Sequence, residues 1–311
     1  QERYLGLYDI NTGEFHFNIY QQGSLPVYPR SMVYSSGSIY IACSYAFNSP
    51  SKLLKINAWG DNQGKTTVEL DKLYNPNILF NIGDNLALTY IYPVENFLGT
   101  FETFSQNLLG NVTHYSNVKD YISSMYYMDG KVYLTSSYYS ENLRDSSLLC
   151  IVPPDTSVRR LKLSGKPAGI VKLADNRLLI GCGGARSIFY FVDPVNFVKT
   201  DSVLCPGGIS RSMVSDLSST YSYFISEDDK IVKFNHTQRT FSTFLNNSFA
   251  GDNFAFSGIN IDPYSGKFYV LYSSRGAYQG GKMQIYSSSG FFEKTIAVGK
   301  NPIQVLFSKI D

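Results

Sequence analysis

Short apolar runs alternate with polar turns along the whole chain, and they fall into a repeated unit. Each unit has an apolar run, a tight turn of Gly, Asn, Asp or Ser, and a second apolar run, as in "SMVYSSGSIYIACSY" and "GINIDPYSGKFYVLYSS". The turns are spaced 44 to 47 residues apart and centre on Gly37, Gly83, Gly130, Asn176, Thr220 and Gly266. Runs of strand length at this period predict a series of similar β-sheets.

Two further strands follow most pairs, for example "SIFYFVDP" and then "KTDSVLC". Four short strands in each unit predict the blade of a β-propeller. The opening "YLGLYDINTGEFHFNIY" is typical of the last two strands of a unit, and the closing "NPIQVLFSKID" of the first. The prediction is therefore an all-β, seven-bladed propeller with four-stranded antiparallel blades. The N- and C-terminal strands share one blade and close the ring, and residues 1–311 form a single domain.

The loops of the predicted blades differ between the two faces of the disc. Turns between the first and second strands, and between the third and fourth, lie on one face and are mostly short, as in "MDG" and "ADN". Loops between the second and third strands lie on the other face with the crossovers to the next blade, and they include "SSYYSENLRDSS" and "SSRGAYQGG". Because loops on a rigid scaffold usually carry binding residues, we expect a ligand on this long-loop face.

Tyrosine and arginine recur in the long loops and crossovers. Tyrosine offers a flat ring with a hydroxyl group, and arginine offers a planar fork of hydrogen-bond donors, so together they suit a sugar, a ring-shaped cofactor or a peptide. The candidate ligand-binding residues are Tyr28, Arg30, Tyr45, Tyr92, Tyr138, Tyr139, Arg186, Arg211, Arg275 and Tyr278, with Arg144 on the same rim. The alternative is that these side chains only cover the hairpin tips.

Composition supports strands and excludes two classes of partner. The chain has 25 Tyr and 21 Phe, which favour half-buried sheet surfaces. Its 27 basic and 25 acidic residues give a net charge of +2, so we expect neither nucleic acid nor an anionic membrane as a partner. No apolar run has the length of a transmembrane segment. The chain starts at Gln1 instead of Met, which agrees with removal of an export signal.

Cysteine and histidine give little support for a metal or catalytic centre. Three of the four cysteines lie in apolar runs, which predicts buried free thiols and leaves one chance disulfide open; they are Cys43, Cys150 and Cys182. The three histidines are predicted to lie far apart, in or beside outer strands, and to have structural roles; they are His16, His114 and His236. We therefore predict no catalytic residue, no metal ligand and no cofactor.

The central channel is the other candidate location for a catalytic metal site. Propeller lactonases hold a divalent ion there with acidic and amide side chains, but the inner-strand candidates Asn81, Asp216 and Asn260 form no recognisable set. The acidic stretch "SEDD", residues 226–229, is interpreted as a solvated loop, with a calcium contact as the alternative. Neither feature indicates an enzyme.

The last unit resembles the YVTN-type, surface-layer-like propellers. The matching positions in "GINIDPYSGKFYVLY" and "EKTIAVGKNPIQVLF" are Asp262, Gly266, Tyr269, Val298, Gly299 and Pro302. The pattern is weak where "DNLAL" and "STYSY" replace it. The resemblance implies an exported Bacteroidetes protein, and relatives include surface lipoproteins that capture corrinoids for an outer-membrane transporter. No corrinoid-contact motif can be matched to residues of this chain.

The resulting functional prediction is a non-enzymatic, exported binding protein at the cell surface or in the periplasm. It would capture a small molecule, corrinoid-like or a glycan, on the long-loop face, and the resemblance adds an outer-membrane transporter as a partner. One alternative is a cell-surface scaffold for protein–protein interactions. Another is a lactonase- or lyase-type enzyme with a metal ion in the central channel. The fold alone cannot choose, because propellers host all three functions.

Overall fold

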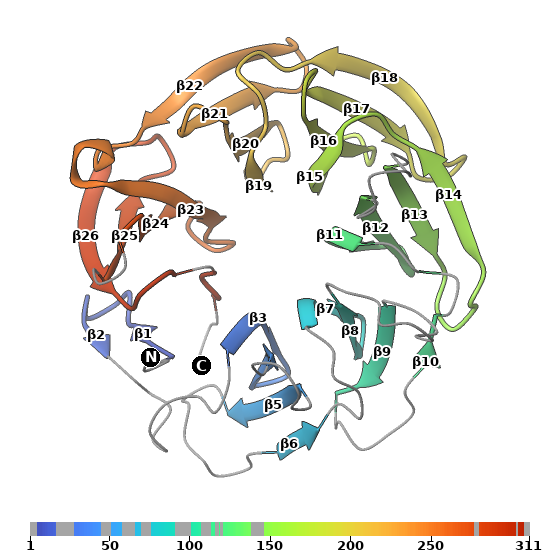
Figure 1. The fold of residues 1–311 in the computed structure, drawn as a ribbon, viewed down its shortest axis with the longest axis horizontal. Coiled ribbons are helices and arrows are strands. Elements are labelled where there is room, and N and C mark those ends of the chain that lie inside the picture. Colours follow the sequence, from blue (N-terminus) through green and yellow to red (C-terminus); the bar gives the residue numbers. More distant parts are fainter. Residues whose placement is uncertain are drawn as a thin grey trace.

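The sheets of the protein are arranged in a ring around a central axis, which confirms the all-β propeller (Figure 1). The computed structural model describes residues 5–16, 28–44, 51–57, 66–69, 76–90, 101–106, 113–115, 118, 121–137, 146–276, 280–302 and 304–307. Six sheets have four strands each, and every one is an antiparallel meander of consecutive strands. We number them blades 1 to 6 in chain order.

The blades of the first half of the ring have these strands. Blade 1 comprises β3 (Tyr28–Ser35), β4 (Ser38–Ser44), β5 (Lys52–Asn57) and β6 (Thr66–Glu69). Blade 2 comprises β7 (Pro76–Ile82), β8 (Asn85–Tyr90), β9 (Phe101–Ser105) and β10 (Thr113–His114). Blade 3 comprises β11 (Tyr121–Met128), β12 (Lys131–Ser137), β13 (Ser147–Ile151) and β14 (Val158–Lys162).

The second half follows the same plan. Blade 4 comprises β15 (Lys166–Lys172), β16 (Leu178–Gly183), β17 (Ile188–Asp193) and β18 (Val198–Leu204). Blade 5 comprises β19 (Arg211–Ser215), β20 (Tyr221–Ile225), β21 (Lys230–Asn235) and β22 (Thr240–Asn246). The short 3-10 helix η1 (Ala250–Asp252) leads into blade 6, which comprises β23 (Phe254–Ile261), β24 (Phe268–Ser274), β25 (Gly281–Tyr286) and β26 (Phe292–Val298).

The predicted number of blades is wrong for the described residues, because six blades, not seven, have four strands. The two N-terminal strands, β1 (Leu7–Tyr8) and β2 (Phe15–His16), form a two-stranded sheet between blade 6 and blade 1 (Figure 1). Residues 304–307, expected as a first strand, form no strand. Gln304 instead uses its side-chain amide: Nε2 donates to Met32 O and Oε1 accepts from Met32 N, each at 3.0 Å.

The C-terminal segment nevertheless joins the last blade to the first. Val305 and Phe307 pack against the buried cluster of blade 6, whereas Leu306 packs against that of blade 1. On the blade 6 side, Ser257 Oγ donates to Pro302 O at 2.8 Å. Alternate side chains therefore point to the two neighbouring blades, as they do in a strand between two sheets.

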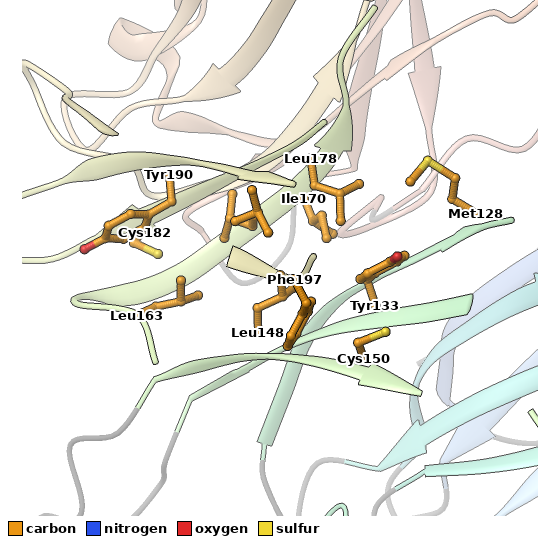
Figure 2. Close-up of a cluster of buried hydrophobic side chains, with 12 residues drawn as sticks. Met128, Tyr133, Leu148, Cys150, Leu163, Ile170, Leu178, Cys182, Tyr190 and Phe197 are labelled. Atoms are coloured by element: carbon orange, nitrogen blue, oxygen red, sulfur yellow. The ribbon is translucent and has the colours of Figure 1, made fainter. Parts of the chain in front are cut away.

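The hydrophobic core is divided into clusters that lie mostly between neighbouring blades. Figure 2 shows the cluster between blades 3 and 4, in which Tyr133 and Cys150 of blade 3 and Ile170 and Cys182 of blade 4 are buried together. The middle strands are buried on both faces, so all six residues of β16 are buried, whereas the outer strand β18 is almost entirely exposed. All four cysteines are buried free thiols, which confirms the prediction for Cys43, Cys150 and Cys182 and adds Cys205.

Every blade has an irregularity at the same place. The pairing of the inner strand with the second strand shifts register close to the start of the inner strand. The shifts fall between Pro29 and Ser31, Pro76 and Leu79, Ile122 and Ser124, Pro167 and Gly169, Arg211 and Met213, and Phe256 and Gly258. Bulges bend a strand and redirect its side chains, so each inner strand is bent at its long-loop end.

The opposite face, which we call the turn face, consists of the turns between the first and second and between the third and fourth strands. Five of the six predicted turn positions have a positive φ, and in blade 5 Ser219 takes this conformation instead of Thr220. Aspartate side chains close many of these turns: Asp262 Oδ1 accepts from Tyr264 N at 2.9 Å, and Asp193 Oδ1 from Val195 N at 2.8 Å. Such bonds fix the turn backbone.

Candidate functional site

Four of the predicted ligand-binding residues have described side chains, and all four are exposed at the long-loop ends of the blades: Arg30, Arg186, Arg211 and Arg275. Arg30 is the extra residue of the bulge in β3, and its Nε donates to Ser44 Oγ at 2.9 Å. Arg211 is the first residue of β19. The sequence placed Arg30 and Arg211 in crossovers, but strand pairing begins earlier than expected, at Tyr28 with Ser44 and at Arg211 with Ile225.

The role of the tyrosines in ligand binding stays a prediction. Tyr28 begins β3, and the structure describes its backbone only. Tyr45, Tyr92, Tyr138, Tyr139 and Tyr278 lie outside the described residues, as does Arg144. The described part of the site is therefore defined by its arginines and by the loops that hold them.

Arg186 and Arg211 come from two segments that are in contact. Ser187, next to Arg186 in the loop between β16 and β17, accepts a hydrogen bond at Oγ from Ile209 N at 3.2 Å. A Cβ atom on Gly183 would lie only 2.2 Å from Ile209 O, so the loop and the crossover are packed backbone to backbone. This close contact holds the backbone segments that carry the two arginines together at the junction of blades 4 and 5.

Asp229 makes the equivalent connection between blades 5 and 6. Its Oδ1 accepts from Phe256 N at 3.1 Å, at the bulge of β23, and its Oδ2 accepts from Asn247 Nδ2 at 2.6 Å. Arg275 Nη2 lies 3.6 Å from Oδ2, and the Arg275 side chain is 58% exposed against 21% for Asp229. The carboxylate is thus bound to the inner strand of blade 6 and to the crossover that follows blade 5, while most of the guanidinium faces solvent.

The acidic loop of residues 226–229 is solvated at Glu227 and Asp228, which are exposed, but its last residue, Asp229, has a structural role that the interpretation as a solvated loop missed. Besides Asp229, Asp228 forms an ion pair with Lys230 and accepts from Ser226 Oγ at 2.5 Å. The Lys230 ammonium is the largest of the causes that lower the pKa of the Asp228 carboxyl. Hydrogen bonds and an ion pair within the fold therefore occupy both aspartates.

A shallow, open depression lies beside Arg275. It is lined by Asp252, Phe254, Gly280, Gly281, Lys282, Ala297 and Val298. Arg275 N donates to Asn253 O at 2.9 Å, which places the arginine next to this wall. Lys282 Nζ lies 3.7 Å from the centre of the Phe249 ring and 4.6 Å from that of Phe254, so the cation covers two aromatic faces.

Sequence reasoning missed Lys282, Phe249 and Phe254 as residues of this site. The available signal was the crossover "FAGDNF", residues 249–254, in which two aromatic residues flank a short polar stretch. The wall combines apolar surface, a lysine, and the carboxylate of Asp252 at 3.7 Å from Lys282 Nζ. Such a surface can contact both the ring and the polar substituents of a ligand.

Two of the channel candidates, Asn81 and Asp216, and one of the histidines, His236, have structural partners. Asn81 Nδ2 donates to Tyr34 O at 2.8 Å, and Asp216 Oδ1 closes its own turn by accepting from Thr220 N at 2.9 Å. His236 is buried, hydrogen-bonded to Ser222 Oγ at 2.7 Å, and burial lowers its pKa. Within the described ranges, no three His, Cys, Asp or Glu side chains are grouped so that they could hold a metal ion.

No helix in the described part of the chain is long and apolar enough to cross a membrane. No protein-family model and no curated protein sequence matches the chain. Solved structures do match it. A quinonprotein alcohol dehydrogenase-like protein from Bacteroides thetaiotaomicron superposes with a TM-score of 0.74 and 14% identity, over 98% of this chain and 76% of that one.

Two further structures are similar over most of their length. Apo AztD from Citrobacter koseri has a TM-score of 0.53 and 12% identity, covering 89% of this chain and 74% of its own. YCF48, solved bound to D1 peptide, has a TM-score of 0.59 and 12% identity, covering 84% and 80%. At these identities the similarity concerns the fold, so the chain shares the β-propeller architecture with all three proteins.

Proposed function

We propose that this protein is a non-enzymatic binding protein that captures a small molecule or a glycan on the long-loop face of a single propeller domain spanning residues 1–311. The observation that carries the proposal is the exposure of Arg30, Arg186, Arg211 and Arg275 at the long-loop ends of their blades, on strands and braced loops. Positions fixed in this way reduce the entropy lost when a ligand binds.

The residues favour a ligand rich in oxygen acceptors. Each guanidinium presents a fork of donors that matches carboxylate, phosphate or amide oxygens. The wall beside Arg275 adds apolar surface and the Lys282 ammonium. An acidic glycan and a corrinoid-like ring with amide side chains both have this chemistry.

The resemblance to YVTN-type propellers supports the rest of the proposal. We infer that the protein is exported to the cell surface or the periplasm, and that it passes its ligand to an outer-membrane transporter.

The test is a thermal-shift screen followed by calorimetry on the hits. The probes are cyanocobalamin, an oligogalacturonate, and its methyl ester, in which every carboxylate is neutralised. A ligand at a hundred times its dissociation constant stabilises the fold by about 2.7 kcal/mol. Combined Arg186→Gln, Arg211→Gln and Arg275→Gln substitutions should weaken binding roughly tenfold or more, because each removes a charged donor.

The matched control is Arg160→Gln on the exposed outer strand β14, which should leave the affinity unchanged. Absence of a shift with every probe would reject the proposal. Binding that survives the triple substitution would place the site elsewhere.

Capture of a peptide is the second candidate function. It is favoured by the open, partly apolar depression beside Arg275 and by the structure of YCF48 with a bound peptide. An acidic peptide added to the same screen separates the two proposals. A lactonase- or lyase-type enzyme with a channel metal is the third candidate. It is less favoured because Asn81 Nδ2 and the Asp216 carboxylate bond within the fold, although the buried Asn81 Oδ1 has no hydrogen-bond partner among the described residues.

A further inference from the structure

Basic side chains without a partner gather where blades 4 and 5 meet on the long-loop face. They are exposed, and none of them has an ion pair, a side-chain hydrogen bond or a ring contact with the described residues: Lys166, Arg186 and Arg211. Most of the other described lysines and arginines form such a contact. Cations held close together repel one another, and an anion that binds between them relieves the repulsion.

The segments that carry these three side chains meet at Gly183. A Cβ atom on Gly165, next to the lysine, would lie 2.7 Å from Gly183 O, and one on Gly183 would lie 2.2 Å from Ile209 O. The two arginines follow Gly183 and Ile209 by three and two residues. Because three residues of chain span at most about 11 Å, all three side chains start from one small area. We call Lys166, Arg186 and Arg211 the basic junction.

Backbone N–H groups add to the donors of the basic junction. Gly184, Ala185 and Gly207 are exposed, and their N–H groups donate to no acceptor among the described residues. A Cβ atom on Gly184 would have no atom within 4 Å, so the space above this backbone is open. Glycine lets a ligand approach the backbone closely, and neighbouring free N–H groups favour an anion.

The acidic side chains near the basic junction do not neutralise it. Glu227 packs against the same crossover, since a Cβ atom on Gly208 would lie 2.5 Å from its Cδ. Asp228 is paired with Lys230, and Asp229 is bound within the fold. In the described part of this area, three unpaired cations therefore accompany one carboxylate without an ion pair, that of Glu227.

We propose that the basic junction is an anion subsite, and that the ligand captured on the long-loop face is an acidic glycan whose carboxylates bind Lys166, Arg186 and Arg211. This inference rests on the proposed function and narrows its ligand. Three cations on three segments suit several carboxylates spaced along a chain, whereas a neutral ring with amide side chains would leave the charges unpaired. The bare backbone at Gly184 and Gly207 leaves room for a sugar ring to approach.

Calorimetry with four probes tests the inference: trigalacturonate, its methyl ester, a tetrathymidylate and a capped triglutamate. The expected result is binding of trigalacturonate that weakens roughly tenfold or more on methylation, because the ester has no charge. The affinity should also fall between about 0.05 M and about 0.5 M NaCl, because salt screens the charges. Combined Lys166→Gln, Arg186→Gln and Arg211→Gln substitutions should weaken trigalacturonate roughly tenfold or more.

The matched control combines Arg160→Gln, Lys199→Gln and Lys294→Gln, which removes the same charge from exposed positions on outer strands and should leave the affinity unchanged. Equal loss in the two triple variants, or equal affinity for the methyl ester, overturns the inference. Tighter binding of tetrathymidylate or triglutamate than of trigalacturonate overturns it as well, because charge alone or a peptide would then explain the subsite.

One further outcome separates this inference from the proposed function. If cyanocobalamin binds, and if its binding is lost in Arg275→Gln but kept in the triple variant of the basic junction, the long-loop face captures a ligand that is not an acidic glycan. The proposed function then stands, and the inference is wrong. Absence of binding to every probe rejects both.

Discussion

Replacing Asp229 should show that this carboxylate holds blades 5 and 6 together. In Asp229→Ala, the buried N–H of Phe256 and the side-chain amide of Asn247 lose their acceptor. An unsatisfied buried donor costs about 1–3 kcal/mol, less for the amide, which keeps its bond to Phe254 O. Residue 229 also has a φ of 57°, which adds about 1 kcal/mol for alanine. The expected loss of unfolding free energy is about 2–5 kcal/mol.

Two companion variants make the reasoning testable. Asp229→Asn keeps one acceptor and tolerates a positive φ, so it should cost about 1–2 kcal/mol. Arg275→Gln removes an ion pair whose atoms are 3.6 Å apart and whose arginine is largely exposed, so it should change stability by about 0.5 kcal/mol at most.

Urea unfolding followed by circular dichroism gives the free energies, and hydrogen exchange at the Phe256 amide reports the local bond. A loss below about 1 kcal/mol in Asp229→Ala would refute the idea that the Asp229 carboxylate holds blades 5 and 6 together, since both donors would then be satisfied in another way. An equal loss in Arg275→Gln would mean that the ion pair, and not the hydrogen bonds, connects the blades.

Three further predictions concern packing, protonation and thiols. Gly183→Ala should destabilise strongly, by about 2–4 kcal/mol in urea unfolding, because its Cβ would lie 2.2 Å from Ile209 O, whereas Gly251→Ala, with no atom within 4 Å, should be neutral. Burial lowers the pKa of His236 in the folded protein, so as the pH falls the imidazole is protonated in the unfolded chain at a higher pH than in the folded one. The free energy of unfolding should therefore fall as the pH drops from about 8 to 5, and His236→Gln should reduce this pH dependence. Burial raises the pKa of Cys182 and Cys205 to about 12, so the folded protein should react slowly with a thiol reagent at pH 8, and all four cysteines should react in denaturant.

The repeat made the architecture predictable. The turns at Gly37, Gly83 and Gly130 recur because each hairpin needs a positive φ at that point, and the same period marks the two faces of the disc. The buried cysteines follow from the apolar strands that contain them. These features depend on residues close in sequence, and a pattern can reveal them.

Contacts between blades could not be predicted in this way. The partners of Asp229 are 18 residues away, in the crossover after blade 5, and 27 residues away, in the next blade, and a carboxylate in an acidic loop looks solvated until those partners are known. Leu217 and Tyr264 are apolar residues next to a turn that are exposed, and the hydrophobic pattern of the sequence does not show this either. The terminal segments carry strand-like patterns, but Gln304 meets Met32 through its side chain, which no strand pattern encodes.

That last contact affects how the chain can fold. Almost all other contacts between blades join units that are neighbours in sequence, so folding can advance from blade to blade, as in a linear repeat array. Gln304 and Met32 are 272 residues apart, and their pairing carries the entropy cost of closing that loop. Once it forms, no blade is at an end of the array and none can fray alone. Ring closure therefore turns an array of mutually dependent neighbours with two open ends into one cooperative unit.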